Sequence, residues 1–143
     1  MKIKQLSLFI ENKTGSLNTP CKLLADAGIS ISTLTLADTR DYGVLRLLVQ
    51  DWENAKAILE KNGLAVKVVD VVAVEVDHTV GSLAGILSSF DEAGINVDYM
   101  YAFGAGVNGK AALIFRFDDA DAALAKLAGK AGIKLLNSAE IFA

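Results

Sequence analysis

Apolar and polar positions along this chain follow two alternating periods, one typical of a strand and one of a helix. Between Leu6 and Ile10 every second residue is apolar, which predicts a strand with one buried face. From Leu17 the apolar residues recur at helical spacing, and Gly28 stands where a helix commonly ends. These periods predict the order of elements along the whole chain.

The same signals predict the order strand, helix, strand, strand, helix, strand in each half. In the first half the expected elements cover residues 6–10, 17–27, 29–37, 44–49, 52–61 and a strand that begins near Ala65. In the second half they cover residues 66–76, 83–90, 95–103, 111–117, 121–131 and 133–142. The valine-rich segment 66–76 carries the chain from one half into the other with no flexible linker.

Short motifs also recur in the two halves. Thr14-Gly15-Ser16-Leu17 returns as Val80-Gly81-Ser82-Leu83, and Ala27-Gly28-Ile29 returns as Ala93-Gly94-Ile95, both at a shift of 66 positions. Two long copies are too few for a solenoid, which closes its core with several short repeats. We therefore expect two small domains, residues 1–70 and 71–143, with any ligand site near the interface between them.

The predicted element order is that of a ferredoxin-like fold, so the fold class is α+β with two βαββαβ units. In this fold the second strand lies at a sheet edge. Here these edges are residues 29–37 and 95–103, with Asp98 as their only charge, and exposed edges with so little charge invite pairing with another strand. We expect the two antiparallel sheets to join through these edges into one eight-stranded sheet with helices on one face, or to pair between chains. A homodimer is the expected assembly.

Composition and charge narrow the classes of function. The chain has 143 residues, 52% of them hydrophobic, and a net charge of -3, which gives no support to nucleic-acid binding. No stretch reaches the roughly 18 to 20 apolar residues of a membrane span. The single cysteine, Cys21, forms no internal disulfide, and the first residues lack the apolar core of a signal peptide. We expect a cytoplasmic protein with no nucleic-acid or membrane partner.

With their element order, the motifs resemble the ACT domain, a small regulatory module that binds small molecules. The resemblance is carried by Glu11-Asn12-Lys13-Thr14-Gly15-Ser16-Leu17 with Ala27-Gly28-Ile29-Ser30-Ile31, and by Asp77-His78-Thr79-Val80-Gly81-Ser82-Leu83 with Ala93-Gly94-Ile95-Asn96-Val97. It covers essentially the whole chain as two ACT domains. It implies that a free amino acid binds between paired domains, with a loop from one and a polar residue at the start of the second strand from the other.

Carried over by position, the resemblance implies two unequal sites. Asn12 with Asn96 places a side-chain amide on both sides of one site, whereas His78 with Ser30 departs from the family pattern and marks a weaker site. The loop agrees physically, because first-turn amides of a helix have no intrahelical partner and favour a carboxylate. The expected first site is Asn12, Lys13, Thr14, Gly15, Ser16, Leu17, Asn96 and Val97. The second is His78, Thr79, Val80, Gly81, Ser82, Leu83, Ser30 and Ile31.

Other candidate chemistry is weak. Residues 104–109 fit the dinucleotide motif G-x-G-x-x-G, but a strand and not a helix is expected after them, so we interpret them as a hairpin connection. His78 is the only histidine, and with Asp77 alone it does not supply a metal site. We find no nucleophile–base–acid constellation, so we expect no catalytic residue, no metal and no cofactor.

Two functions remain open. The first is a non-catalytic regulatory module that binds an effector, most simply a free amino acid, and signals to an enzyme or transcription partner. The second is an assembly subunit that uses ACT-like sheets for protein–protein association and keeps a vestigial ligand site.

Overall fold

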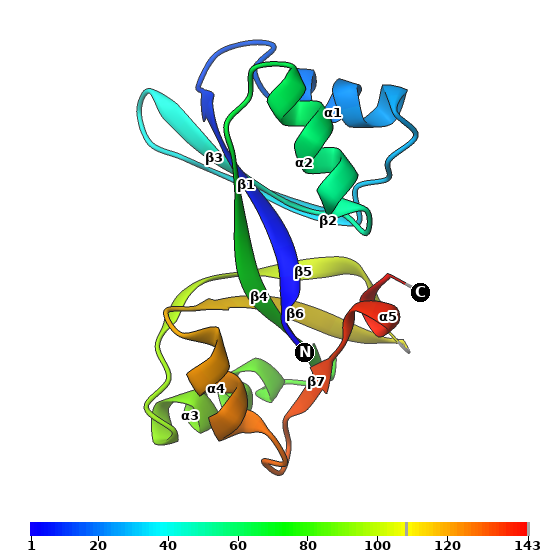
Figure 1. Cartoon of the computed structure of the whole chain (residues 1–143). Helices are drawn as coiled ribbons and strands as arrows, with labels where there is room; N and C mark the ends of the chain where they lie inside the picture. The colour runs from blue at the N-terminus through cyan, green and yellow to red at the C-terminus, as the bar shows by residue number, and fades with distance from the viewer. Residues whose placement is uncertain (108, 143) are drawn as a thin grey trace. The chain divides into compact units, whose positions relative to one another are not determined.

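The computed structural model describes residues 1–107 and 109–142, and the side chains of all of these except residues 104–107 (Figure 1). The chain divides into two compact units, Lys4–Val69 and Asp70–Ala143 with Met1–Ile3. We call them the first and the second unit. Compactness alone does not show independent folding, so the division into domains 1–70 and 71–143 stays a prediction.

The first unit has the predicted element order. Its elements are β1 (Ile3–Glu11), α1 (Asn18–Asp26), β2 (Thr33–Asp38), β3 (Tyr42–Leu48), α2 (Trp52–Lys61) and the beginning of β4 (Val66–Val76). The strand order is β2-β3-β1-β4, and β3 pairs antiparallel with both β1 and β2. This is the ferredoxin-like arrangement expected from the sequence.

One face of this sheet forms the core of the first unit. Leu6 and Leu8 on β1 lie opposite Leu47 and Leu45 on β3, and all four side chains are fully buried. Leu24 of α1 and Ala55 and Leu59 of α2 complete the same cluster. Each buried leucine contributes on the order of 1.5–3 kcal/mol through removal of its side chain from water, which holds both helices on this face.

The second unit repeats the order with one addition. Its elements are β4, α3 (Ser82–Glu92), β5 (Val97–Val107), β6 (Lys110–Phe117), α4 (Ala120–Leu127), β7 (Lys134–Leu136) and α5 (Ser138–Ile141). β4 pairs antiparallel with β6 and with β7, and β5 pairs antiparallel with β6. A strand follows the glycine-rich residues 104–109, as expected for a hairpin connection, although Asn108 lies outside the described residues.

Aromatic side chains dominate the core of the second unit. The ring of Phe90 on α3 meets those of Phe115 and Phe117 on β6 edge to face, with centroids 5.0 and 5.4 Å away. Val72 and Val74 of β4 lie in the same cluster and are fully buried. Phe90 therefore fixes α3 on the sheet.

The strand count corrects the predicted eight-stranded sheet. Within the described residues there are seven strands, because the unbroken run Val66–Val76 is a single strand that serves as the fourth of the first repeat and the first of the second. Among the described residues β2 pairs with β3 and β5 pairs with β6, and these second strands stand at opposite ends of the strand order β2-β3-β1-β4-β6-β5, so the expected pairing of β2 with β5 within this chain is wrong. Their pairing between chains stays a prediction.

The end of the chain also differs from expectation. The predicted last strand, residues 133–142, is wrong beyond Leu136, where a short helix begins. Asn137 accepts a hydrogen bond from the Glu140 N–H, and the Glu140 carboxylate accepts one from the Asn137 N–H. This capping box starts α5 and outweighs the strand preference of the apolar residues around it.

Candidate functional site

Both predicted ligand loops turn at a glycine with a positive φ angle. Gly15 and Gly81 adopt positive φ angles of 92° and 87°, which residues with a Cβ rarely adopt. In each copy the N–H of the following serine donates to the carbonyl two residues before the glycine: Ser16 to Lys13 and Ser82 to Thr79, both at 3.2 Å. A carboxylate placed at either loop must therefore rely on neighbouring amides more than on the serine N–H.

Asn12 lies beside a small cavity in the first unit. The cavity, of about 80 Å³, is lined by Asn12, Lys13 and Leu17 from the loop and by Leu36 and Asp38 from β2, among others. The Asn12 N–H donates to the Asp41 carbonyl at 2.9 Å, which ties the loop to the turn between β2 and β3. The structure thus brings together three of the predicted first-site residues.

Lys13 is held by its neighbour Glu11. Its ammonium lies 2.9 Å from a Glu11 carboxylate oxygen. The hydrogen bond to Glu11, and then the charge of Glu11, raise the pKa of Lys13 above its ordinary value. Both side chains are well exposed, so the pair orients Lys13 more than it stabilises the fold.

The predicted strand residues lie just before the second strands. Asn96 and Val97 stand at the start of β5, and the Asn96 amide donates to an Asp98 carboxylate oxygen at 3.3 Å. Ser30 and Ile31 precede β2, which begins at Thr33. Asn12 and Asn96 belong to different units, so their combination in one site stays a prediction.

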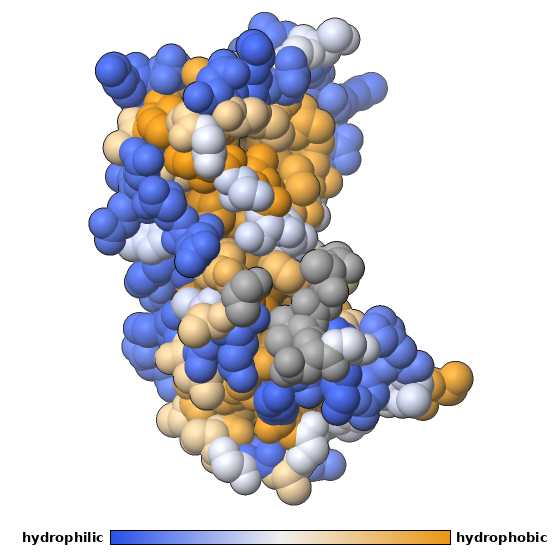
Figure 2. Space-filling model, turned by 90° about the vertical axis from the view of Figure 1, so that its right-hand side faces the viewer, coloured by the Kyte–Doolittle hydropathy of each residue, from blue (hydrophilic) through white to orange (hydrophobic). Residues whose placement is uncertain are grey.

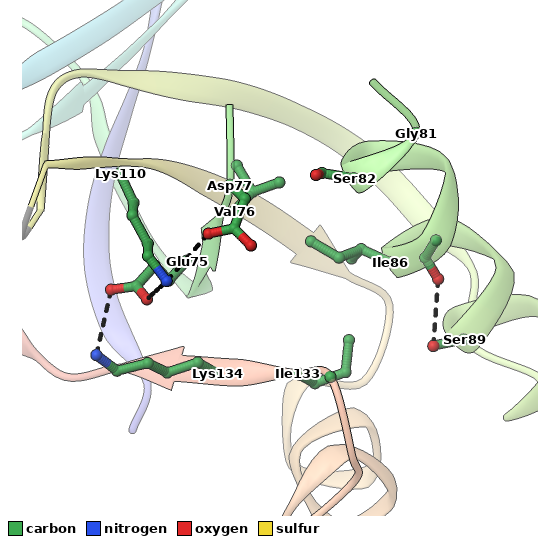
Figure 3. Close-up of a pocket in the computed structure, with 12 residues that line it drawn as sticks. Glu75, Val76, Asp77, Gly81, Ser82, Ile86, Ser89, Lys110, Ile133 and Lys134 are labelled. Carbon is green, nitrogen blue, oxygen red and sulfur yellow. Dashed lines mark hydrogen bonds and ion pairs between the residues drawn. The ribbon is translucent and has the colours of Figure 1, made fainter. Parts of the chain in front are cut away.

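A larger pocket, of about 530 Å³, lies beside the loop of the second unit (Figure 3). We call it the β4–α3 pocket. From the predicted second site only Gly81 and Ser82 line it. The other lining residues come from β4 and the residue after it, from α3, from β6, and from β7 with the two residues before it: Glu75, Val76, Asp77, Gly85, Ile86, Ser89, Lys110, Gly132, Ile133 and Lys134.

Four charged side chains stand along one wall of this pocket, and sequence analysis did not predict them as site residues. The Lys110 ammonium lies 3.0 Å from Asp77 and 3.6 Å from Glu75, and the Lys134 ammonium lies 3.2 Å from Glu75. The Glu75 side chain is only 7% exposed, so the two lysines offset the cost of burying its carboxylate. The hydrogen bond that Lys110 donates to Asp77, followed by the charges of Asp77 and Glu75, raises the pKa of Lys110.

The other residues of the predicted second site point elsewhere. His78, Thr79, Val80 and Leu83 are exposed and do not line the pocket. The Thr79 and Ser82 hydroxyls bond to each other at 2.5 Å, which occupies the serine side chain at the start of α3. A charged residue in a valine-rich strand, Glu75, was the one sequence signal that could have pointed to the pocket.

Among the described residues, no three histidine, cysteine or acidic side chains gather as metal ligands would. None of their helices has the length and apolar character needed to cross a bilayer.

Curated relatives of this chain are small subunits of an enzyme. The acetolactate synthase small subunit of Buchnera aphidicola subsp. Baizongia pistaciae is 30% identical over 74 residues, 52% of this chain and 46% of that protein. Its counterpart from Buchnera aphidicola subsp. Schizaphis graminum is 32% identical over 69 residues, 48% of this chain and 44% of that protein. The chain thus spans about half the length of these relatives.

Solved structures and a family model match nearly the whole chain. Protein BT0572 from Bacteroides thetaiotaomicron is 34% identical, with a TM-score of 0.90 over 99% of this chain and 96% of that one. The ligand-free regulatory subunit of aspartate kinase from Thermus thermophilus shares the fold at 16% identity, with a TM-score of 0.60 over 87% of this chain and 90% of that one. The model of the ACT domain pair matches residues 1–136. The resemblance read from the two loops is confirmed, and this chain belongs to the ACT domain pair family.

Proposed function

We propose that this chain is a non-catalytic regulatory module that binds a free amino acid and passes its bound state to a protein partner in the cytoplasm. The observation that carries the proposal is the glycine turn that both loops share: Gly15 and Gly81 have positive φ angles between a strand and a helix, and residues of each loop line a cavity. The names of its similar proteins support a regulatory role, since they include a regulatory subunit of aspartate kinase and small subunits of acetolactate synthase.

The proposed first site combines the Asn12 loop with Asn96. The ligand carboxylate would be bound by backbone amides of residues 14–17, and the two side-chain amides would bind its polar groups. A side-chain amide both donates and accepts hydrogen bonds, which suits a zwitterion. Asn12 already lies at a cavity with Lys13 and Leu17, which supports the loop half of this site.

A second candidate function is assembly alone, with the ligand site vestigial. It is favoured by apolar side chains that remain exposed on the first unit: Phe9, Leu17, Leu34, Leu36 and Tyr42. Figure 2 shows a broad hydrophobic area on this unit. Large exposed apolar areas commonly mark protein–protein contact, and a homodimer is the simplest assembly that covers one.

A thermal-shift series with the standard amino acids tests the proposal. We expect at least one amino acid to raise the melting temperature, because a ligand that binds only the folded chain stabilises it. By calorimetry, Asn12→Ala and Asn96→Ala should each weaken the binding of that amino acid by about 1.5–3 kcal/mol, or about tenfold to a hundredfold in affinity. Ser30→Ala and His78→Ala are the matched controls and should weaken it less.

The other possible results distinguish between the two sites and between the two candidate functions. Larger losses at His78 and Ser30 would move the amino acid to the weaker site. If no amino acid binds and sedimentation shows a stable dimer, the assembly function is correct. A monomer at micromolar concentration contradicts the assembly function.

A further inference from the structure

Four positions that line the β4–α3 pocket carry different residues in the two repeats. At the shift of 66 positions, Glu75 corresponds to Phe9, Gly85 to Thr19 and Ser89 to Leu23. At a shift of 68 positions, which applies after two extra residues in the second copy, Lys110 corresponds to Tyr42. Lys110 lies next to Asp77, and Tyr42 faces the equivalent Glu11 across β1 and β3. The second copy therefore has charged and small side chains where the first has apolar or larger ones.

The small residues leave room along α3. A Cβ added at Gly85 would meet no atom within 4 Å, so the space beside this turn of the helix is open. Ser89 lines the same wall one turn further on, and its hydroxyl donates to the Gly85 carbonyl at 3.2 Å. The volume of about 530 Å³ falls within the roughly 300–1,000 Å³ of small-molecule sites.

The charges along the opposite wall alternate in sign. In spatial order they are Asp77, Lys110, Glu75 and Lys134, joined by ion pairs of 3.0, 3.6 and 3.2 Å. The net charge of these four side chains is zero. An anionic ligand would therefore meet a carboxylate beside each ammonium, and a cationic ligand would meet an ammonium beside each carboxylate. A zwitterion can place its own ammonium near a carboxylate and its carboxylate near a lysine at once.

The ion pair between Lys110 and Asp77 can open at small cost. The two side chains are 47% and 58% exposed, and exposed ion pairs contribute little to stability. The buried Glu75 carboxylate, 7% exposed, retains Lys134 as its partner. Between the two walls lie the apolar side chains of Val76, Ile86 and Ile133. These fit an apolar side chain of the ligand and offer no partner to a charged one.

We propose that the β4–α3 pocket binds a small zwitterion with an apolar side chain, and that the second unit alone supplies the pocket. The proposal goes beyond the loop-and-strand site above, because every lining residue lies between Glu75 and Lys134 and neither Asn12 nor Asn96 takes part. Gly85 and Ser89 determine the space for the ligand, and Asp77, Lys110, Glu75 and Lys134 orient its two charges.

Three probes that share the same apolar side chain test the charge pattern of the pocket. Calorimetry measures the binding of each probe to the full chain. L-Leucine carries both charges, 4-methylpentanoate only the carboxylate and 3-methylbutylamine only the ammonium. We expect L-leucine to bind, and each singly charged probe to bind at least about tenfold more weakly, since each lacks one charge-assisted contact. Equal binding of all three probes, or no binding of L-leucine, overturns the proposal.

Substitutions taken from the first repeat test the location. Gly85→Thr and Ser89→Leu introduce the side chains that the first repeat has at Thr19 and Leu23. Both fill the pocket, and each should weaken the binding of L-leucine at least about tenfold. Ser88→Leu, on an exposed part of the same helix outside the pocket, is the matched control and should leave binding unchanged. Circular dichroism checks that each variant is folded, and Asp77→Asn provides a loss that does not depend on filling space.

The same measurement separates this proposal from the proposed function. Binding of L-leucine in the β4–α3 pocket should be unchanged by Asn12→Ala and Asn96→Ala. If those two variants abolish it while Gly85→Thr and Ser89→Leu do not, the pocket proposal is wrong and the loop-and-strand site stands. If the pattern is reversed, the pocket stands and the loop-and-strand site is wrong.

Discussion

The ammonium of Lys110 lies 3.0 Å from the carboxylate of Asp77, at the mouth of the β4–α3 pocket. The hydrogen bond that Lys110 donates to Asp77, and then the charges of Asp77 and Glu75, raise the pKa of Lys110 above its ordinary value of 10.5. A lysine whose pKa rises on folding binds its proton more tightly in the folded chain. Its contribution to stability is therefore complete below pH 10.5 and disappears as the pH rises through the higher folded value.

Lys110→Met tests this linkage through the pH dependence of unfolding. We expect the difference in unfolding free energy between the wild type and this variant to be constant at neutral pH and to shrink above pH 10.5. Urea denaturation at a series of pH values measures it. Lys126→Met, at an exposed position on α4, is the control and isolates the effect of the Lys110 contacts. A difference that grows with rising pH would contradict the assignment.

The loop glycines should be intolerant of a side chain. Gly81→Ala forces alanine into a φ of 87° and should lower the unfolding free energy by about 1–2 kcal/mol. Gly85→Ala, four residues along in α3, should raise it by about 0.5–1 kcal/mol, because open space surrounds its Cβ and the backbone is helical. Chemical denaturation of both variants compares them. Equal effects of the two substitutions on stability would show that the positive φ angle is not the reason for glycine at position 81.

Phe90 should be the most costly truncation in α3. Its ring is 1% exposed and contacts Phe115 and Phe117 edge to face, so Phe90→Ala should cost about 3–5 kcal/mol. Phe9→Ala is the matched control, because the Phe9 side chain is 72% exposed in the monomer and should change stability by only about 0.5 kcal/mol. Thermal and urea unfolding provide the comparison. A large loss at Phe9 would indicate that its side chain is buried in an assembly.

Asn137 should start the last helix. Asn137→Ala removes the acceptor for the Glu140 N–H and should cost about 0.5–2 kcal/mol. Ser138→Ala leaves both capping bonds in place and serves as the control. Hydrogen exchange of the Ile141 N–H, which donates to the Asn137 carbonyl, reports whether α5 frays. Unchanged exchange in Asn137→Ala would mean that the buried Ile141 side chain, and not the cap, holds this helix.

Local signals predicted much of this protein. Gly28 and Gly94 end equivalent helices at φ angles of 72° and 70°, and Ile29 and Ile95 donate to the carbonyls of Leu24 and Phe90, both at 2.9 Å. These features depend on residues close together in the sequence, so the repeat could be read from them. The element order and the family followed from the same short-range patterns.

Features that depend on long-range pairing were missed. The valine run showed no boundary, but only hydrogen bonding to β6 and β7 makes its second half the first strand of the second unit. The C-terminal helix was missed for another reason: its signal is local, the Asn137–Glu140 capping bonds, but the apolar residues around it resemble a strand.

The amino-acid sequence by itself determined the repeat, the loop glycines and the order of helices and strands, because turns, caps and periodicity act between near neighbours. Only the tertiary structure determined where the charged side chains of the second unit come together. Glu75 and Lys134 are 59 residues apart, yet pairing of β4 with β7 brings their charges to 3.2 Å. Such a contact depends on strand register, and no local pattern around either residue encodes it.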